Sequence, residues 1–364
     1  MAMVQTKRLA ALLLALLLTL FLLPSALADS GVVSGTTVSG TVRVYLSSIS
    51  SLTAVDVSIA GSYSVGGDTS RALSRGQNIR VSNSGGTLMM TANGQTQTMG
   101  SRFKLRRHQT SGENGVRIAQ ARYPASLYPG DIEFIAKGGN VQIVVHVYME
   151  DYMLGVLPYE MDNSFPLEAL KAQAVAARTY ALYKMRGASG AYDLVDNTND
   201  QVFRGYNASN ERAIRAVQET AGVACYNGSA LAICYYTASN GGQVELVRNV
   251  WGKGEGDYIT MHDDPYDVEN PESVVKSAAI AKTAKDGIVY NQQLTDYLLD
   301  GVSEAVTALG YSGDAADTRI AGVAGVSLHT PQGGTNSKVM TQMRFDLTVQ
   351  CRQKPTAAMQ DEEV

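Results

Sequence analysis

Residues 164–180 read SFPLEALKAQAVAARTY and begin the most regular pattern in the chain. Apolar and small side chains recur there every three or four positions, the spacing of one face of an α-helix. The members of this stripe are Leu167, Leu170, Ala174, Ala177 and Ala181. Pro166 suits a first helical turn, because its missing N–H would have no partner there. The pattern predicts a helix from Pro166 to about Met185, with a face that packs closely against other backbone.

The stretch just before it, residues 150–161, reads EDYMLGVLPYEM. Leu154, Leu157 and Met161 fall at helical spacing, and Asp151 is a suitable capping residue, so a short helix is expected. Pro158 should end or kink that helix just before Glu160.

Glu160 therefore lies where one helix stops and the next begins, flanked by Tyr159, Met161 and Phe165. Such neighbours remove water from a carboxylate, disfavour its charged form and raise its pKa, as a general acid at neutral pH requires. The alternative is an ordinary glutamate at a helix junction.

The flanking regions predict an α+β fold. Residues 41–148 carry short alternating or β-branched runs separated by Gly, Asn and Ser, which are typical of strands and turns. Beyond the helix we expect helices at about 208–220 and 291–309, a hairpin at 223–236, and strands at 319–328 and 338–350. The expected architecture is a β-rich N-terminal part followed by a helical core with an inserted or flanking antiparallel sheet.

The first 28 residues have the features of a secretory signal. Lys7 and Arg8 precede an apolar run that ends before Pro24, and the A-x-A cleavage pattern follows at Ala26–Ala28. Cleavage after Ala28 and export are expected; an uncleaved membrane anchor is the alternative. Without these residues, which contain two basic and no acidic side chains, the net charge changes from −4 to −6.

The three cysteines do not suggest a disulfide scaffold. A turn at Asn227-Gly228 would pair Cys225 with Ala230, and so leave Cys234 four residues further along the opposite strand. The two sulfurs would then lie roughly 13 Å apart, too far to bridge. Free, buried thiols are expected for this pair, whereas Cys351 is left open as a partner for either.

Composition and motifs exclude several classes of function. The chain is slightly acidic, with 30 basic and 34 acidic residues and no long basic run, so nucleic acid is not an expected partner. Nucleotide-binding loops, HExxH, CxxC pairs and the G-x-S-x-G elbow are absent from the sequence, and its four His are scattered. Neither a metal nor a cofactor is expected.

Together, residues 150–161 and 164–180 resemble the SpoIID/amidase-enhancer (LytB) family of cell-wall proteins. Further segments follow in the family's order: DQVFRGY at 200–206, the helix end at 213–222, YYTASNGGQVE at 235–245, VWG at 250–252 and DPY at 264–266. The resemblance spans roughly residues 40–350 and is dense between 150 and 266. It implies a catalytic core at 149–350. Composition and pattern predict the remaining divisions: a flexible segment at 29–40, a β-rich domain at 41–148 and a disordered tail at 351–364.

The resemblance also implies an activity. The family includes lytic transglycosylases, which cut peptidoglycan glycan strands between MurNAc and GlcNAc and leave 1,6-anhydro-MurNAc ends. The matching catalytic acid/base is Glu160. Matching motifs place five further side chains at the substrate, namely Arg178, Tyr236, Ser239, Gln173 and Gln201. One carboxylate suffices for this chemistry, because the substrate's own muramic 6-hydroxyl replaces the nucleophile or water that a second carboxylate serves in a hydrolase.

Several alternatives remain open from the sequence. The alternative for Arg178 is a salt bridge with Glu168 or a neighbour, and the alternative for Tyr236 is packing in a sheet without a role at the substrate. Some family members hold zinc through Cys and His near the Gly-Gly loop, but residues 235–250 contain neither, so no zinc is expected. Expected partners are peptidoglycan glycan strands and a cell-wall amidase. The alternative function is a non-catalytic wall-binding enhancer of an N-acetylmuramoyl-L-alanine amidase.

Overall fold

The structure, a computed structural model, describes residues 40–109, 112–252, 258–271 and 292–353. The chain divides into two compact units between Tyr236 and Thr237, and each unit is described by itself. The expected signal at 1–28, nearly all of the segment at 29–40 and most of the tail at 351–364 lie outside the described residues.

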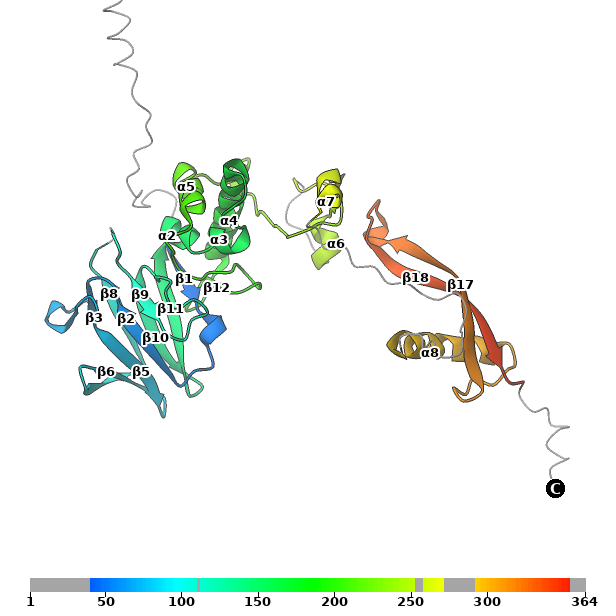
Figure 1. The fold of residues 1–364 in the computed structure, drawn as a ribbon, viewed down its shortest axis with the longest axis horizontal. Coiled ribbons are helices and arrows are strands. Elements are labelled where there is room, and N and C mark those ends of the chain that lie inside the picture. Colours follow the sequence, from blue (N-terminus) through cyan, green and yellow to red (C-terminus); the bar gives the residue numbers. More distant parts are fainter. Residues whose placement is uncertain (1–39, 110–111, 253–257, 272–291, 354–364) are drawn as a thin grey trace, which may run out of the picture. The chain divides into compact units, whose positions relative to one another are not determined.

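The first unit begins with two antiparallel-rich sheets that share one hydrophobic core (Figure 1). One sheet has the strand order β12-β1-β11-β10-β8-β3-β4. Its strands are β1 Thr41–Tyr45, β3 Tyr63–Val65, β4 Ala72–Leu73, β8 Arg102–Arg107, β10 Asp131–Lys137, β11 Asn140–Tyr148 and β12 Leu194–Val195. The other has the order β7-β6-β5-β2-β9. Its strands are β2 Ala54–Ile59, β5 Asn78–Ser84, β6 Thr87–Ala92, β7 Gln95–Gly100 and β9 Val116–Ile118.

Alternation of side chains explains how these strands pack. In β1 and β2 every second residue is buried, because successive side chains of a strand point to opposite faces. The central strand β11 is buried along most of its length, since sheet neighbours flank it on both sides. The β-rich N-terminal part of the predicted α+β fold is thus confirmed.

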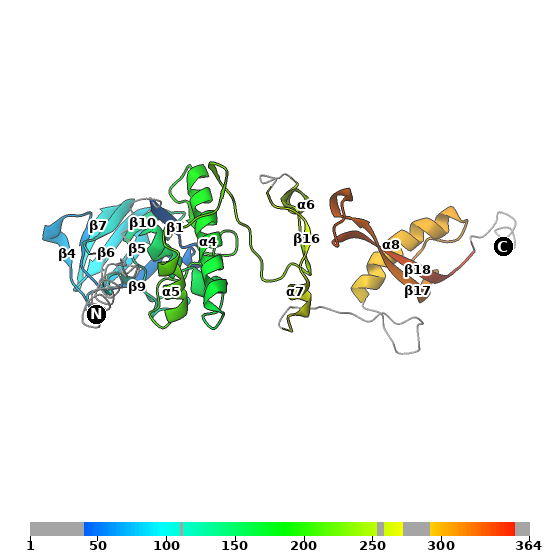
Figure 2. The ribbon, with the colours of Figure 1, turned by 90° about the horizontal axis from the view of Figure 1, so that it is seen from above.

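Four helices follow the sheets in the same unit: α2 Met149–Leu154, α3 Leu157–Glu160, α4 Leu167–Gly187 and α5 Glu211–Glu219. The predicted helix from Pro166 to Met185 is confirmed as α4, with Pro166 as its N-cap and its alanine face buried. The short helix before it is split into α2 and α3 around Gly155, with Pro158 in the first turn of α3. Figure 2 shows α4 and α5 side by side next to the sheets.

Strand β11 passes into helix α2 without a loop, since Tyr148 ends the strand and Met149 begins the helix. The division expected at residues 148/149 therefore falls inside the first compact unit, and the boundary between units lies at residue 236. The physical reason is the shared core, in which Met149, Tyr152 and Met153 of α2 pack with the side chains of the sheets.

The hairpin near the end of this unit has a different register from the one expected. β13 Tyr226–Asn227 pairs with β14 Ala230–Leu231, so that Asn227 faces Ala230 and the turn is Gly228-Ser229. Gly228 adopts φ 61°, the left-handed conformation that a first turn position of this kind favours. Because the register moves by two residues, Cys225 lies opposite Ala232, and the expected separation of the Cys225 and Cys234 thiols is wrong.

The second unit contains short elements and a long hairpin. These are β15 Gln243–Val244, α6 Val247–Trp251, β16 His262–Asp263, α7 Pro265–Glu269, α8 Gln292–Ala308, β17 Thr318–Pro331 and β18 Met340–Cys351. The last three confirm the helix and the two strands expected there. No helix in the part of the chain that the structure describes is long and apolar enough to cross a membrane.

Candidate functional site

Glu160 is the last residue of α3, where the backbone turns to an extended conformation at Met161. One carboxylate oxygen, Oε1, accepts a hydrogen bond of 2.7 Å from the backbone N–H of Val202. The side chain is half-buried, and within the described ranges it forms no salt bridge. The helix end therefore presents a carboxylate that is held by a backbone donor and not by a cation.

Tyr236 binds the same carboxylate through its hydroxyl group. This hydroxyl also accepts a hydrogen bond of 3.0 Å from Nε2 of Gln201. The Gln201 amide donates its hydrogen to the Tyr236 oxygen. The Tyr236 hydroxyl therefore donates its own hydrogen to the Glu160 carboxylate, which accepts it. Tyr236 thus acts on Glu160 and is not a residue that only packs in a sheet, whereas its predicted contact with substrate stays a prediction.

Gln201 is fully buried and positions Tyr236. Its Nε2 also donates to the backbone carbonyl of Ala177 in α4, at 3.1 Å, and its Oε1 accepts from the Tyr152 hydroxyl, at 3.1 Å. With both ends of the amide occupied and no exposed surface, Gln201 acts on the site through Tyr236. The prediction that Gln201 contacts substrate does not fit this burial.

Burial raises the pKa of Glu160 above the usual glutamate range. The Val202 N–H, the Tyr236 hydroxyl and the positive charge of Arg204 oppose this shift, because each stabilises the ionised form. Burial also raises the pKa of Tyr236, and the neighbouring Glu160 adds to that effect. The tyrosine therefore stays protonated as a donor, and the carboxyl binds a proton more tightly than an exposed glutamate does.

Arg178 has a different role from the one predicted. Its side chain is fully buried, and its guanidinium forms a two-point ion pair with Glu150 at 2.7 and 2.9 Å. It also donates to the carbonyl of Val223 at 3.1 Å. Since no part of the group is exposed, Arg178 is a structural residue that ties α4 to α2, not a ligand for substrate. The alternative of a salt bridge is the correct one, with Glu150 as the partner in place of Glu168.

The other two predicted residues are Gln173 and Ser239, each described by its own contacts. Gln173 is on α4, and its Nε2 is buried without a hydrogen-bond partner among the described residues. Ser239 belongs to the second unit, where its hydroxyl donates to Asp267 at 2.7 Å and helps to hold the Gly241–Gly242 loop. The structure brings Glu160, Tyr236 and Gln201 together, and a substrate contact by Gln173 or Ser239 stays a prediction.

Three contributors to the site were not singled out from the sequence. They are Tyr152, the backbone N–H of Val202 and Arg204. Val202 and Arg204 belong to the DQVFRGY segment, whose only predicted importance was as part of the family resemblance. A backbone donor leaves no compositional signal, so only its place beside Gln201 would have indicated it.

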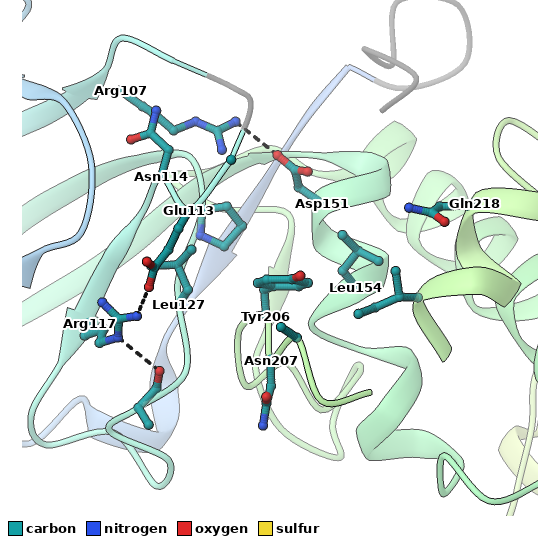
Figure 3. A pocket seen from close by; sticks show the side chains of 15 residues that line it. Arg107, Glu113, Asn114, Arg117, Leu127, Asp151, Leu154, Tyr206, Asn207 and Gln218 are labelled. Atoms are coloured by element: carbon teal, nitrogen blue, oxygen red, sulfur yellow. Dashed lines mark hydrogen bonds and ion pairs between the residues drawn. The ribbon is translucent and has the colours of Figure 1, made fainter. Parts of the chain in front are cut away.

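A separate cavity of about 630 Å³ lies between the sheets and helices α2 and α5 (Figure 3). Its wall includes the Arg107–Asp151 ion pair, at 3.0 Å, and the pair of Arg117 with Glu113. Burial raises the pKa of Asp151, and Arg107 opposes that shift. Glu160 is not among the lining residues, and the charged groups of this cavity are paired with one another.

Within the described residues, no three His, Cys, Asp or Glu side chains gather in a way that would hold a metal ion. At Glu160 the structure brings together a half-buried carboxyl with raised pKa, a protonated tyrosine and a backbone donor. This combination fits proton transfer to and from a bound group.

Comparisons with known proteins match the part of the chain that contains Glu160. Residues 137–226 match the family model described as stage II sporulation protein, SpoIID. The resemblance seen in the sequence is confirmed over that segment, which includes Glu160, Gln173, Arg178 and Gln201 but ends before Tyr236.

Three curated relatives share this part of the chain. The amidase enhancer of Bacillus subtilis is 43% identical over 110 residues, 30% of this chain and 15% of that protein. Stage II sporulation protein D of the same organism is 30% identical over 150 residues, 36% and 43% of the two chains. An uncharacterized protein of Brachyspira hyodysenteriae is 41% identical over 128 residues, 34% of each. The chain thus spans less than half the length of the curated relatives it matches.

Proposed function

We propose that this protein is a lytic transglycosylase that cleaves the MurNAc–GlcNAc bond of peptidoglycan and forms 1,6-anhydro-MurNAc ends. The observation that carries the proposal is Glu160, a half-buried carboxyl whose pKa is raised by burial and which receives hydrogen bonds from Tyr236 and Val202. A module that only binds glycan has no need of a carboxyl in this state.

The chemistry requires one proton carrier. Protonated Glu160 donates its proton to the glycosidic oxygen as the bond from that oxygen to C1 of MurNAc breaks. The resulting carboxylate takes the proton of the muramic 6-hydroxyl, whose oxygen bonds to C1 and closes the anhydro ring. No water is consumed, and Glu160 returns to its protonated form. Tyr236 and the Val202 N–H stabilise the carboxylate between the two transfers.

The surroundings of Glu160 favour this route over hydrolysis. Hydrolytic glycosidases place a second carboxyl roughly 5–10 Å from the acid. Arg204 is the charge that acts on the pKa of Glu160. The Asp200 carboxylate, which like Glu160 acts on Tyr152, is paired with Lys184 at 2.6 Å. One carboxyl without a paired cation, among the described residues, matches a reaction in which the substrate supplies its own nucleophile.

The test is digestion of glycan strands stripped of stem peptides, followed by mass spectrometry of the products. We expect fragments with anhydro ends from the wild-type protein and at least about a hundredfold fewer from Glu160→Gln. Glu168→Gln is the matched control, since Glu168 is an exposed glutamate on the neighbouring helix. Hydrolytic ends from the wild type, or equal yields from both variants, would contradict the proposal.

A second function is favoured by the name of one relative, the amidase enhancer of Bacillus subtilis. In this role the protein would bind the wall and stimulate an N-acetylmuramoyl-L-alanine amidase. The two functions separate in one assay, in which the amidase digests intact wall with added wild-type protein or Glu160→Gln. Stimulation by both proteins supports the enhancer, whereas stimulation only by the wild type supports cleavage.

Both functions need a protein on the cell-wall side of the membrane. The charged start, the apolar run and Ala26–Ala28 support export with cleavage after Ala28. Mass analysis of the protein recovered outside the cells tests this, with Asp29 expected as its first residue. Its role, in sporulation or in wall remodelling, would then follow from when the cells secrete it.

A further inference from the structure

Cys225 and Cys234 lie on the two arms of the hairpin that leads into Tyr236. The carbonyl of Cys225 accepts a hydrogen bond of 3.0 Å from the N–H of Ala232, which places these two residues opposite each other. Cys234 follows Ala232 two residues later on the same arm. The pairing of β13 with β14 ends at Leu231. Beyond it, the two arms of the hairpin need not keep the distance between paired strands.

The surroundings bring the two thiols together. The Cys225 N–H donates to Oγ1 of Thr179 on α4, at 2.9 Å, and the Cys234 thiol donates to the carbonyl of Ala232, at 3.3 Å. The Thr179 hydroxyl also reaches the Cys234 thiol, and the Cys225 thiol is a hydrogen-bond neighbour of Cys234. Both side chains are partly exposed and both thiols are free.

Burial raises the pKa of the Cys234 thiol to about 12, and the adjacent Cys225 thiol adds to that shift. Because thiolate is the reactive form, Cys234 attacks an external disulfide slowly at neutral pH. Its nearness to Cys225 is what makes a bond between the two accessible.

We propose that Cys225 and Cys234 are a redox site, which closes to an intramolecular disulfide by exchange with a small-molecule disulfide such as oxidised glutathione. The Cys225 thiolate attacks one sulfur of the oxidant, forms a mixed disulfide and releases the first thiol. Cys234 then attacks the Cys225 sulfur, forms the internal bond and releases the second thiol. The protein loses two electrons and two protons, and the oxidant is reduced to two thiols.

The disulfide would act on the site through the chain that it closes. Cys234 is two residues before Tyr236, whose hydroxyl binds Glu160 and Gln201. Cys225 is fixed to Thr179, two residues after Ala177, which holds Gln201. Oxidation therefore links the segment that carries Tyr236 to Cys225, which is hydrogen-bonded to α4, the helix that also holds Gln201. We expect the first unit to become more rigid and more stable.

The experiment uses the full chain treated with oxidised glutathione, with peptide mass mapping and thermal unfolding as readouts. We expect a linked Cys225–Cys234 peptide, lighter by two hydrogen atoms than the reduced peptides. We also expect a rise in Tm on the order of 5 °C, for a closed loop of about ten residues, reversed by dithiothreitol. Neither readout depends on glycan cleavage, so failure here is distinct from failure of the proposed function.

Two variants serve as controls. Cys234→Ser should lose both the linked peptide and the rise in Tm, whereas Cys351→Ser should keep both. Glutathione adducts that persist on Cys225 or Cys234 without an internal bond would overturn the proposal. A bridge from either residue to Cys351 would overturn it equally.

Discussion

Glu150 and Glu160 stand ten residues apart in the chain, and their surroundings are opposite. Glu150, in the first turn of α2, is buried against Arg178 and also accepts the N–H of Gly222 at 3.0 Å. Glu160, at the end of α3, is half-buried and binds Tyr236 and Val202, without a paired cation in the described residues. Partial burial alone does not mark a reactive carboxyl. What distinguishes Glu160 is that neutral donors, not a guanidinium, hold it.

The largest expected effect comes from breaking the paired carboxylate. Arg178→Met leaves Glu150 as an uncompensated buried charge and strands the carbonyl of Val223. We expect a loss of about 3–5 kcal/mol in the free energy of unfolding, measured by chemical denaturation. The double variant Glu150→Gln/Arg178→Met should recover a large part of it, because no charge is left unpaired. If Arg178→Met is as stable as wild type and only glycan affinity falls, Arg178 is a substrate ligand after all.

The next largest effect concerns the hydrogen bond from Tyr236 to Glu160. Tyr236→Phe removes a hydrogen bond that lowers the pKa of Glu160, so this pKa should rise further. Cleavage needs the protonated form, and activity should fall as pH rises through that pKa. The variant should therefore keep its residual activity to higher pH than the wild type, at a rate lower by about tenfold. The measurement is a pH–rate profile of anhydro-end formation. An unchanged alkaline limb would show that Tyr236 does not act on Glu160.

A smaller effect concerns stability at the same carboxyl. Because the pKa of Glu160 is higher in the folded than in the unfolded protein, ionisation opposes folding at pH values above the unfolded pKa. Glu160→Gln removes that cost and should stabilise the protein on the order of 0.5 kcal/mol at pH 7. The gain should vanish at a pH below the unfolded pKa, where both forms are neutral. Thermal unfolding at the two pH values measures it, and a loss of stability at pH 7 would show a structural role for the charge.

The smallest effect is the exposed counterpart of the buried ion pair. Arg215 pairs with Glu219 at 2.6 Å on the surface of α5, with 65% of the arginine side chain exposed. Arg215→Ala should change the free energy of unfolding by less than about 0.5 kcal/mol, because water and salt screen such pairs. Chemical denaturation of Arg215→Ala and Arg178→Met side by side compares an exposed ion pair with a buried one. The difference between their losses in free energy of unfolding measures the effect of burial. A loss comparable to that of Arg178→Met would remove the basis of the comparison.

The sequence predicted what depends on local spacing. The helix α4 follows from the periodicity of residues 164–180. Glu160 does stand at a helix end, but Pro158 does not end that helix as expected, because it lies in the first turn of α3 and the break falls at Gly155. The partner of Arg178 was not predictable in the same way, because Glu150 is 28 residues away and meets it only once α2 and α4 pack. The predicted register of the hairpin was wrong for a related reason. Gly228 suits either of two adjacent turns, Asn227-Gly228 and Gly228-Ser229. The protein adopts the second, together with tertiary contacts such as that of Cys225 with Thr179.

The direct passage from β11 into α2 has a consequence for how this fold can be divided. No loop separates Tyr148 from Met149, so the position of α2, and of α3 after it, depends on β11. This strand is an interior strand of the seven-stranded sheet. The matched family segment begins at residue 137, so it contains all of this strand along with the helices. The helices therefore do not form a separate domain. A fragment that begins at residue 149 would lose the sheet that positions Glu160. A transfer of the site into another protein would have to include that sheet.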